Sequence, residues 1–310
     1  MGPLQGIKII EMAGLGPGPF AGMLLADMGA DVILVERKAS TSKKRMPDCN
    51  RRGKRSIALN LKQAEDIERL LQLVEKADVL FEGFRPGVME RLGLGPEVLH
   101  QRNPKLVIGR MTGWGQTGPL SKAAGHDINY ISLTGALHAI GRQGERPVPP
   151  LNLVGDYGGG GMFLVMGILA ALLETQRSGK GQVIDAAMTD GSAVLMSVFN
   201  TLHGMGQWST RIGSNLLDSG AHFYDVYETK DGKYISIGSI EPQFYALLVQ
   251  KAALNPEEFS AQYDPSQWPT YKEKLMEVFK SKTRDEWCEI MEGTDVCFAP
   301  VLDFVEAQSH

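Results

Sequence analysis

The stretch GIKIIEMAGLGPGPFAGMLLADMGADVILVER, residues 6–37, decides the fold. Its first part, 6–12, is an apolar run that predicts a buried strand. Gly and Pro at 13–19 predict a tight turn, and the apolar spacing over 20–30 is typical of a helix that stops at a glycine. A second apolar run, 31–37, predicts another strand. Strand, helix and strand in this order predict a βαβ unit and a parallel sheet.

The same alternation continues along the chain. Residues 65–77 form an amphipathic helical pattern, and the runs at 78–84 and 105–115 predict two further strands. Alternating strands and helices favour a doubly wound α/β domain. The pattern changes after about residue 190, and 226–240 predicts a hairpin whose turn carries Lys-Asp-Gly.

We therefore predict two domains, which the length of 310 residues permits. The first, 1–190, is a large Rossmann-like α/β domain with a parallel sheet. A helix and loop over 191–220 link it to a smaller α+β domain at 221–310.

Composition narrows the class of protein. The chain has 36 acidic residues against 32 Lys and Arg, and this net charge of -4 argues against non-specific nucleic-acid binding. Its three cysteines, Cys49, Cys288 and Cys297, match no zinc-ligand spacing and predict reduced thiols in a cytosol-like compartment. We expect no metal site.

No segment of the sequence predicts export or membrane insertion. The N-terminus lacks a cationic region followed by a long apolar run, so we expect no signal peptide. The longest apolar run, 162–173, is too short to span a bilayer and predicts a buried helix. The last residues, 301–310, carry no recognised targeting tripeptide. We expect a cytoplasmic protein, with a bacterial source assumed, or a mitochondrial or peroxisomal one if the source is eukaryotic.

The loop after the first strand departs from a dinucleotide-binding fingerprint. Gly14 and Gly16 fit its first two glycines. Pro19 stands where a third glycine must let the helix approach the strand closely. We therefore do not expect NAD as a cofactor.

A basic segment follows the second strand. Residues 43–55 carry seven Lys and Arg against one acid, Asp48. Such a cluster suits a polyanionic ligand such as a nucleotide phosphate, or else it is a solvated surface loop. No aromatic residue is interleaved with it, which disfavours nucleic acid.

Three ionisable residues are candidates for chemistry. His126 in GHDINY, 125–130, is either a loop or cap residue or a base. Asp156 precedes four glycines and a buried helix, so it is either a helix N-cap or an acid beside a ligand that the glycines let approach. Glu241, before Pro242, is typical of a helix start. These residues indicate an α/β enzyme that binds a phosphorylated ligand and uses a His and carboxylates.

Taken together, these stretches resemble a known family over nearly the whole chain. The similarity runs through residues 4–37 and through RRGKRSIALNLK, FRPGVMERLGLGPEVL, GHDINY, LNLVGDYGGGG, GKGQVIDAAM, IEPQFY and GTDVCFAPVL. The sequence resembles the α-methylacyl-CoA racemases, within the family III CoA-transferase superfamily. The combination of GHDINY with IEPQFY is typical of the racemase branch.

The resemblance implies racemisation of 2-methylacyl-CoA thioesters between R and S forms, by two-base 1,1-proton transfer through an enolate. His126 would serve one face of the substrate and Asp156 the other, and Glu241 would orient His126. The backbone N–H of Asp127 and the positive end of a helix are the candidates to stabilise the enolate oxygen. Inversion needs both bases, because a single base returns the proton to the face it left. No cofactor is expected, since CoA is part of the substrate.

The resemblance also implies a CoA site. Arg37 would meet the nucleotide phosphates. Ala58, Leu59, Asn60 and Leu61 would line the adenine side, and Ala124, Gly125, His126, Asp127, Ile128 and Asn129 would run along the pantetheine and thioester.

Five further basic residues belong to this prediction. Arg45, Arg52 and Lys54 of the basic segment would contact phosphate. Arg85 and Arg91 would lie near the CoA channel, or would serve in ion pairs and helix caps.

The family forms interlocked homodimers, with each active site between the large domain of one chain and the small domain of the other. Glu241 would then face His126 of a partner chain. Family members continue past position 310, and we expect this chain to lack their C-terminal return segment. The expected partners are the acyl-CoA substrate and a second copy, with no nucleic acid and no membrane.

Two other functions stay open. In a CoA-transferase of the same superfamily, the residue matching Asp156 is a nucleophile that forms an acyl anhydride, and no second base is needed at His126. A CoA-binding protein without turnover would bind CoA but exchange no α-proton. The methionine-bearing segments 22–28 and 162–167 either line a tolerant acyl surface or pack in the core.

Overall fold

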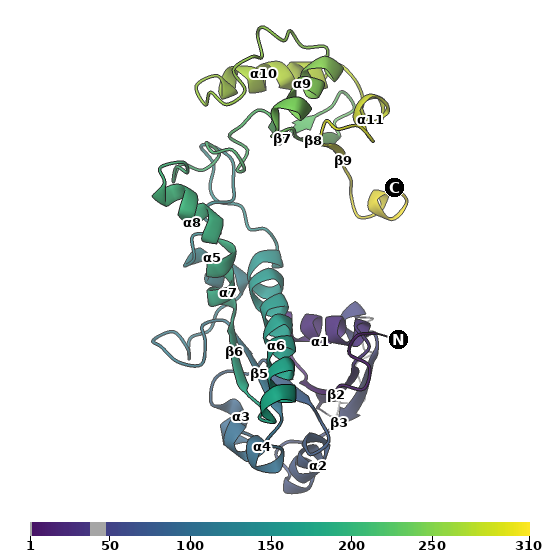
Figure 1. The fold of residues 1–310 in the computed structure, drawn as a ribbon, viewed down its shortest axis with the longest axis vertical. Helices are drawn as coiled ribbons and strands as arrows, with labels where there is room; N and C mark the ends of the chain where they lie inside the picture. Colours follow the sequence, from purple (N-terminus) through teal and green to yellow (C-terminus); the bar gives the residue numbers. More distant parts are fainter. Residues whose placement is uncertain (1, 38–47) are drawn as a thin grey trace. The chain divides into compact units, whose positions relative to one another are not determined.

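The computed structural model describes residues 2–37 and 48–310 and divides the chain into two compact units (Figure 1). The large unit comprises Met1–Leu137 and Pro149–Val198, and the small unit comprises His138–Val148 and Phe199–His310. The segment 138–148 therefore packs with the small unit, although it lies inside the range predicted for the large domain. An ion pair of 2.6 Å between Arg142 of this segment and Asp225 explains the difference.

A six-stranded parallel sheet forms the centre of the large unit. Its order is β3-β2-β1-β4-β5-β6, and every neighbouring pair is parallel. This confirms the predicted Rossmann-like α/β fold and the strands predicted at 6–12, 31–37, 78–84 and 105–115. The strands are β1 (Lys8–Met12), β2 (Asp31–Glu36), β3 (Lys54–Ala58), β4 (Val79–Glu82), β5 (Val107–Thr112) and β6 (Val183–Ala187).

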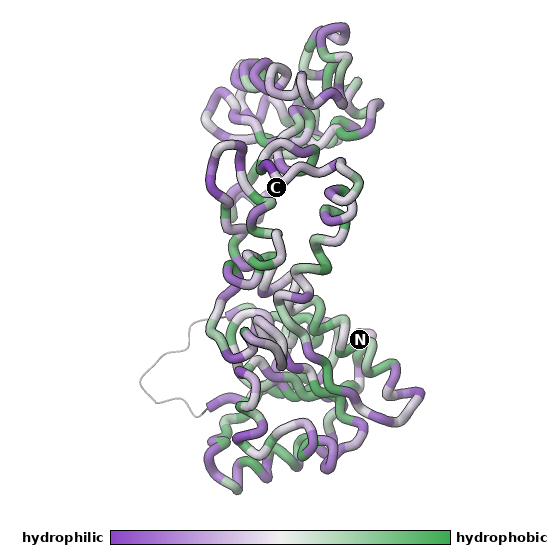
Figure 2. Tube along the Cα trace, turned by 90° about the vertical axis from the view of Figure 1, so that its left-hand side faces the viewer, coloured by the Kyte–Doolittle hydropathy of each residue, from purple (hydrophilic) through white to green (hydrophobic). Residues whose placement is uncertain are grey.

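Helices cover both faces of this sheet. Side chains alternate along each strand, so Ile9 packs in one layer and Ile10 in the other. Helices α1 and α6 pack on the first face, and α2 and α4 on the second. Figure 2 shows hydrophobic segments, drawn green, inside this unit. The helices of the large unit and its junction are α1 (Pro17–Asp27), α2 (Ala64–Val74), α3 (Val88–Arg91), α4 (Pro96–Arg102), α5 (Asp127–Ser132), α6 (Met162–Ser178), α7 (Met188–Leu195) and α8 (Ser197–Gly204), with a short 3-10 turn at Cys49–Arg51.

The chain order of these strands creates a crevice at one edge of the sheet. After β1 the chain adds β2 and β3 on one side, and then returns to add β4, β5 and β6 on the other. The loops that follow the neighbouring strands β1 and β4 therefore diverge from each other. Open α/β sheets bind ligands in the crevice between such loops. Gly16 with φ 67° and Pro17 at the first helical position make the sharp turn from β1 into α1.

The glycine run before α6 forms a π-helix, η2 (Leu153–Gly161), which the sequence pattern does not predict. It continues directly into α6, so Leu153–Ser178 is one helical stretch of 26 residues that could cross a membrane by length and composition alone. The prediction of a helix too short to span a bilayer is therefore wrong about its length. Leu164, Val165 and Ile168 pack in the core against the sheet, as expected of a core helix.

The small unit is an antiparallel sheet covered by helices. The sheet order is β7-β8-β9, and the hairpin predicted at 226–240 is confirmed as β7 and β8, with Gly232 at φ 72° in its turn. Its core is rich in aromatic side chains, including Phe223, Tyr227 and Trp287. The elements are β7 (Tyr224–Glu228), β8 (Tyr234–Gly238), β9 (Phe298–Val301), α9 (Pro242–Lys251), α10 (Trp268–Phe279), α11 (Arg284–Met291) and a 3-10 turn at Glu306–Gln308.

Candidate active site

A cavity of about 260 Å³ lies at the switch point of the large unit. Loops that follow β1, β4 and β5 form its walls, because parallel strands end at a common edge. His126 and Arg85 line it together with Ala124 and Gly125. The fold thus brings together four residues that the sequence placed in the catalytic and CoA-binding set.

His126 is presented by a turn that its own neighbours stabilise. It is the N-cap residue of α5, and its backbone N–H donates to Asn129 Oδ1 at 3.0 Å. The hydroxyl of Tyr130 donates to the carbonyl of Gly125 at 2.5 Å, and its ring packs edge-on against Trp114 at 4.8 Å between centroids. The imidazole itself is exposed. The motif therefore fixes the backbone and leaves the base accessible.

The glycines around this turn make room for the Tyr130 ring. A Cβ at Gly113 would lie 2.1 Å from Tyr130 Cε1, and one at Gly125 would lie 2.8 Å from the same atom. Larger residues at either position would push the ring, and with it the carbonyl of Gly125, out of place.

Asp156 lies inside the π-helix η2. Helices of this type are rare, and those that occur are often found at functional sites. The Oδ2 of Asp156 accepts from Asn152 Nδ2 at 3.1 Å, and a Cβ at Gly16 would lie 3.0 Å from the same oxygen. The carboxylate therefore borders the loop after β1. The interpretation of Asp156 as an N-cap of α6 is wrong, because that helix begins only at Met162.

Asp127 joins the segment of His126 to Asp156. Its side chain is buried, and its Oδ2 accepts from the backbone N–H of Asp156 at 2.7 Å. Burial raises the pKa of Asp127 and the charge of Asp156 raises it further, while hydrogen bonds from the N–H groups of Asp156 and Gly155 act in the opposite direction. The sequence analysis singled out only the backbone N–H of this residue, because residues 29 positions apart give no local signal of contact.

The four glycines after Tyr157 pack against protein rather than against a ligand. A Cβ at Gly159 would lie 2.6 Å from the backbone N of Ser192 in α7. One at Gly160 would lie 2.8 Å from Met188 Cγ, and one at Gly161 would lie 2.7 Å from Phe20 in α1. For these three, the prediction that they let a thioester approach is wrong.

In the described part of the basic segment, residues 48–55, the four basic side chains all pair with acids of the same unit. Lys54 pairs with Glu11 at 2.5 Å, and both side chains are 1% exposed. Burial raises the pKa of Glu11 to about 7 and lowers that of Lys54, and each charge opposes the shift of the other. Lys54 is therefore not a phosphate contact, contrary to the prediction. Arg52 is exposed and pairs with Asp27, while Arg45 lies outside the described residues.

Of the predicted adenine-side residues, Ala58 ends β3 and the other three follow it, at the same edge of the sheet as the cavity. Arg37 follows β2 there and is exposed. Leu59, however, packs in the core, so the prediction that its side chain lines the adenine is wrong. The N–H of Asn60 donates to Asp66 Oδ2 at 2.8 Å, which fixes this turn.

Four residues predicted to contact CoA lie away from the lining of this cavity. Asp127 is buried, whereas Ile128 and Asn129 are exposed on α5. Arg91 is exposed on α3, where its charge contributes to lowering the pKa of Glu90. Within residues 2–37 and 48–310, none of the four lines the cavity that holds His126.

Three methionines line this cavity, and they are not those that the sequence suggested. Met12 and Met111 belong to β1 and β5, and Met188 follows β6. The predicted segments 22–28 and 162–167 contribute none of the cavity's described lining residues. Met12, Met111 and Met188 all lie at or just after the ends of strands. This position could have identified them from the sequence, since strand ends meet at the crevice.

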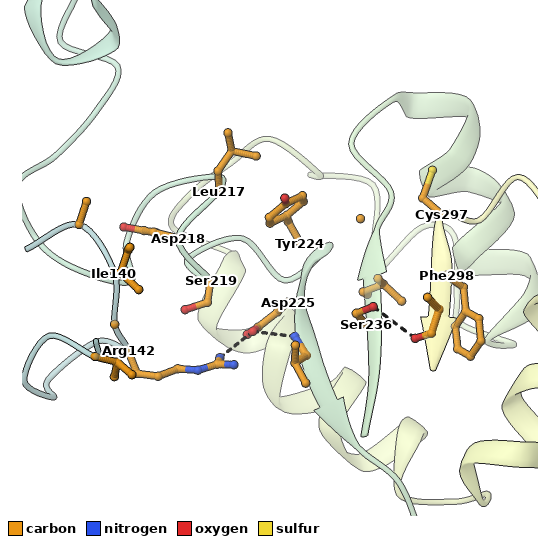
Figure 3. A pocket seen from close by; sticks show the side chains of 17 residues that line it. Ile140, Arg142, Leu217, Asp218, Ser219, Tyr224, Asp225, Ser236, Cys297 and Phe298 are labelled. Atoms are coloured by element: carbon orange, nitrogen blue, oxygen red, sulfur yellow. Dashed lines mark hydrogen bonds and ion pairs between the residues drawn. The ribbon is translucent and has the colours of Figure 1, made fainter. Parts of the chain in front are cut away.

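The small unit carries a larger cavity of about 720 Å³, lined by β7, β8, β9 and the segment 138–148. Figure 3 shows Arg142 on one side of it, paired with Asp225, and Cys297 on the other. Glu241 occupies the N-cap position of α9, as predicted from Pro242. Among the described residues its exposed carboxylate makes no capping hydrogen bond, and its charge, after burial, raises the pKa of Cys297.

No group of three or more His, Cys, Asp or Glu side chains that could hold a metal ion occurs in the part of the chain that the structure describes.

Comparison with known proteins places these features in a family. The model of CoA-transferase family III matches residues 4–310. The chain is 51% identical to alpha-methylacyl-CoA racemase of Mus musculus over 307 residues, 99% of this chain and 80% of that protein. It is 48% identical to the same enzyme of Homo sapiens over 309 residues, again 99% and 80%.

The fold is also similar to that of a solved structure. The crystal structure of a CAIB/BAIF family protein from Brucella suis matches with a TM-score of 0.83 and 26% identity, over 100% of this chain and 86% of that one. The chain belongs to CoA-transferase family III.

Proposed function

We propose that this protein is an isomerase that racemises 2-methylacyl-CoA thioesters through a planar enolate. About half of its residues are identical to those of the mammalian racemases over nearly its full length, which supports this activity over others in the family. The observation that carries the proposal is the link from His126, which lines the cavity, through Asp127 to Asp156, whose carboxylate borders the loop after β1.

The two side chains act from opposite faces of the α-carbon. His126 takes or returns the proton on one face, and Asp156 does so on the other. The α-proton of a thioester is weakly acidic, so the developing enolate oxygen needs a donor. The N–H of Asp127, at the first position of α5, has no partner within that helix and is the proposed donor.

CoA is proposed to lie along the carboxyl edge of the sheet. Arg37 and the residues after β3 follow neighbouring strands there, and Arg85 reaches the cavity from the loop after β4. Arginine suits this role because its planar guanidinium binds phosphate through two hydrogen bonds. No further cofactor takes part in the proposed reaction.

A second copy of the chain is proposed to complete the site. Glu241 of one chain would hydrogen-bond to His126 of the other, which fixes the imidazole tautomer. Its carboxylate is exposed and, among the described residues, makes no capping bond, so it is free for this contact. Exposed apolar side chains at Met162, Met166 and Leu173 along α6 are of the kind that a homodimer buries.

A CoA-transferase is the second candidate, because family membership and the position of Asp156 suit both reactions. In that reaction the Asp156 carboxylate attacks the thioester carbonyl, the C–S bond breaks, CoA leaves as a thiolate, and a mixed anhydride between the acyl group and Asp156 remains. A second base at the position of His126 then has no role. The two candidates therefore differ in what the loss of His126 does.

The test is to incubate one enantiomer of a 2-methylacyl-CoA with the protein and to follow its chirality. We expect inversion, and a loss of at least about a hundredfold in both His126→Ala and Asp156→Ala. Asp285→Ala is the control, because this aspartate side chain is 80% exposed. Transfer of CoA to an added free acid that survives in His126→Ala would instead establish the transferase.

A further inference from the structure

We infer that the Asp127 carboxylate is a positioning residue for Asp156, so that its removal impairs the proton transfer on one face of the substrate and spares the other. This inference rests on the proposed racemisation. It concerns the Asp127 side chain, whereas the proposed enolate donor is the backbone N–H of the same residue.

The contact is short and enclosed. Asp127 is 6% exposed, and its Oδ2 accepts from the backbone N–H of Asp156 at 2.7 Å. A Cβ at Gly155 would lie 2.5 Å from the same oxygen. Glycine at this position therefore lets the carboxylate reach the first turn of the π-helix, just before the proposed acid.

The carboxylate is retained although it is costly to bury. Its other oxygen, Oδ1, has no hydrogen-bond partner among the described residues. A buried polar atom without a partner destabilises a fold. A neutral amide of the same shape would avoid burying a charge, so we assign the charge at this position to the site rather than to stability. A charged acceptor also holds N–H donors more strongly than a neutral one.

Separate contacts hold His126. Its N–H is bound by Asn129, and the preceding carbonyl of Gly125 is bound by the Tyr130 hydroxyl. Neither contact involves the Asp127 carboxylate. Loss of that carboxylate therefore frees the backbone of Asp156 while the turn that presents His126 keeps its own hydrogen bonds.

The consequence can be measured one enantiomer at a time. In deuterated water, each enantiomer loses its α-proton to one base, and exchange is observed whether or not the centre inverts. The enantiomer whose exchange Asp156→Ala abolishes defines the face of Asp156. We expect Asp127→Asn to slow exchange of this enantiomer by roughly tenfold to a hundredfold, as a small misplacement of a catalytic group does. Exchange of the other enantiomer should stay close to that of the wild type.

Two further variants sharpen the test. Gly155→Ala introduces the Cβ that meets Asp127 Oδ2, so it should reproduce the same asymmetry, and it serves if Asp127→Asn does not fold. Asn129→Ala removes the bond to the His126 backbone and should slow the opposite enantiomer.

Equal losses for both enantiomers in Asp127→Asn and in Gly155→Ala, with wild-type exchange intact, would overturn this inference alone, because a merely structural role affects both faces. Absence of exchange in the wild type would overturn the proposed function and this inference with it.

Discussion

His222 of the small unit is a buried histidine whose surroundings keep its ring neutral. It is 0% exposed, and its Nε2 lies 2.8 Å from the hydroxyl of Tyr245. The rings of Phe223 and Tyr271 pack edge-on against it. Burial, with a smaller contribution from the charge of Lys272, lowers its pKa to about 3.

This histidine predicts how stability changes with acid. Between pH 6.5 and about 3 the unfolded chain binds a proton at His222 that the folded chain does not, so the free energy of unfolding falls as the pH falls through this window. The contribution reaches roughly 5 kcal/mol. Urea unfolding of the wild type and of His222→Phe at several pH values measures it. The variant should show a flatter acid dependence, and equal slopes would contradict the assignment.

At the scale of elements, the site depends on how closely η2 packs against α7. A Cβ at Gly159 would lie 2.6 Å from the Ser192 backbone N, and one at Gly191 would lie 1.9 Å from the carbonyl of Gly159. At Gly159 and Gly191 the two backbones therefore lie too close for any larger residue. Since Asp156 lies in η2, this packing sets its position.

Gly159→Ala is expected to destabilise the fold by about 1–3 kcal/mol, as overpacking does, and to lower racemase activity together with stability. The measurements are the thermal midpoint and kcat. Gly204→Ala is the matched control, because Gly204 lies in α8 with no atom within 4 Å of its added Cβ. The control should keep full activity. An unchanged Gly159→Ala variant would show that η2 does not need this close packing.

The elements also show which parts of the fold can be predicted from sequence. Strands β1, β2, β4 and β5 are apolar runs buried on both faces, and such runs are unambiguous in an alternating pattern. Strand β3 is not predicted, because it begins at Lys54, whose charge is neutralised by Glu11 from a distant part of the chain. The π-helix escapes prediction because glycines typically indicate a loop, and only its tight neighbours make it helical.

The candidate site likewise has residues that the sequence identifies and contacts that only the structure shows. His126, Asp156 and Arg85 are identified from motifs, and the fold places His126 and Arg85 at one cavity. The role of the Asp127 side chain and the burial of Lys54 depend on contacts between distant segments. Local composition contains no information on such contacts, so only the structure reveals them.

At the scale of the whole molecule, His126 belongs to the large unit and Glu241 to the small unit. The proposal that Glu241 comes from a second copy can be tested by mixing two inactive variants. His126→Ala and Glu241→Ala should each lose activity. After their subunits are unfolded and reassembled together, half of the dimers are mixed, and each mixed dimer has one intact site.

Activity of the mixture should therefore recover to about a quarter of the wild-type value. A mixture that stays inactive, with both variants folded and dimeric, would place both residues of each site in the same chain. Mixing either variant with itself in the same way serves as the control.

The most direct test of the central claim is to count deuterium during inversion. One enantiomer of a 2-methylacyl-CoA is incubated with the protein in deuterated water, and NMR follows the α-position and the chirality together. The account predicts that inverted product carries deuterium at the α-carbon, because the second base returns a solvent-derived proton to the opposite face. Inversion without any deuterium uptake, or an unchanged α-centre while CoA passes to another acid, would contradict it.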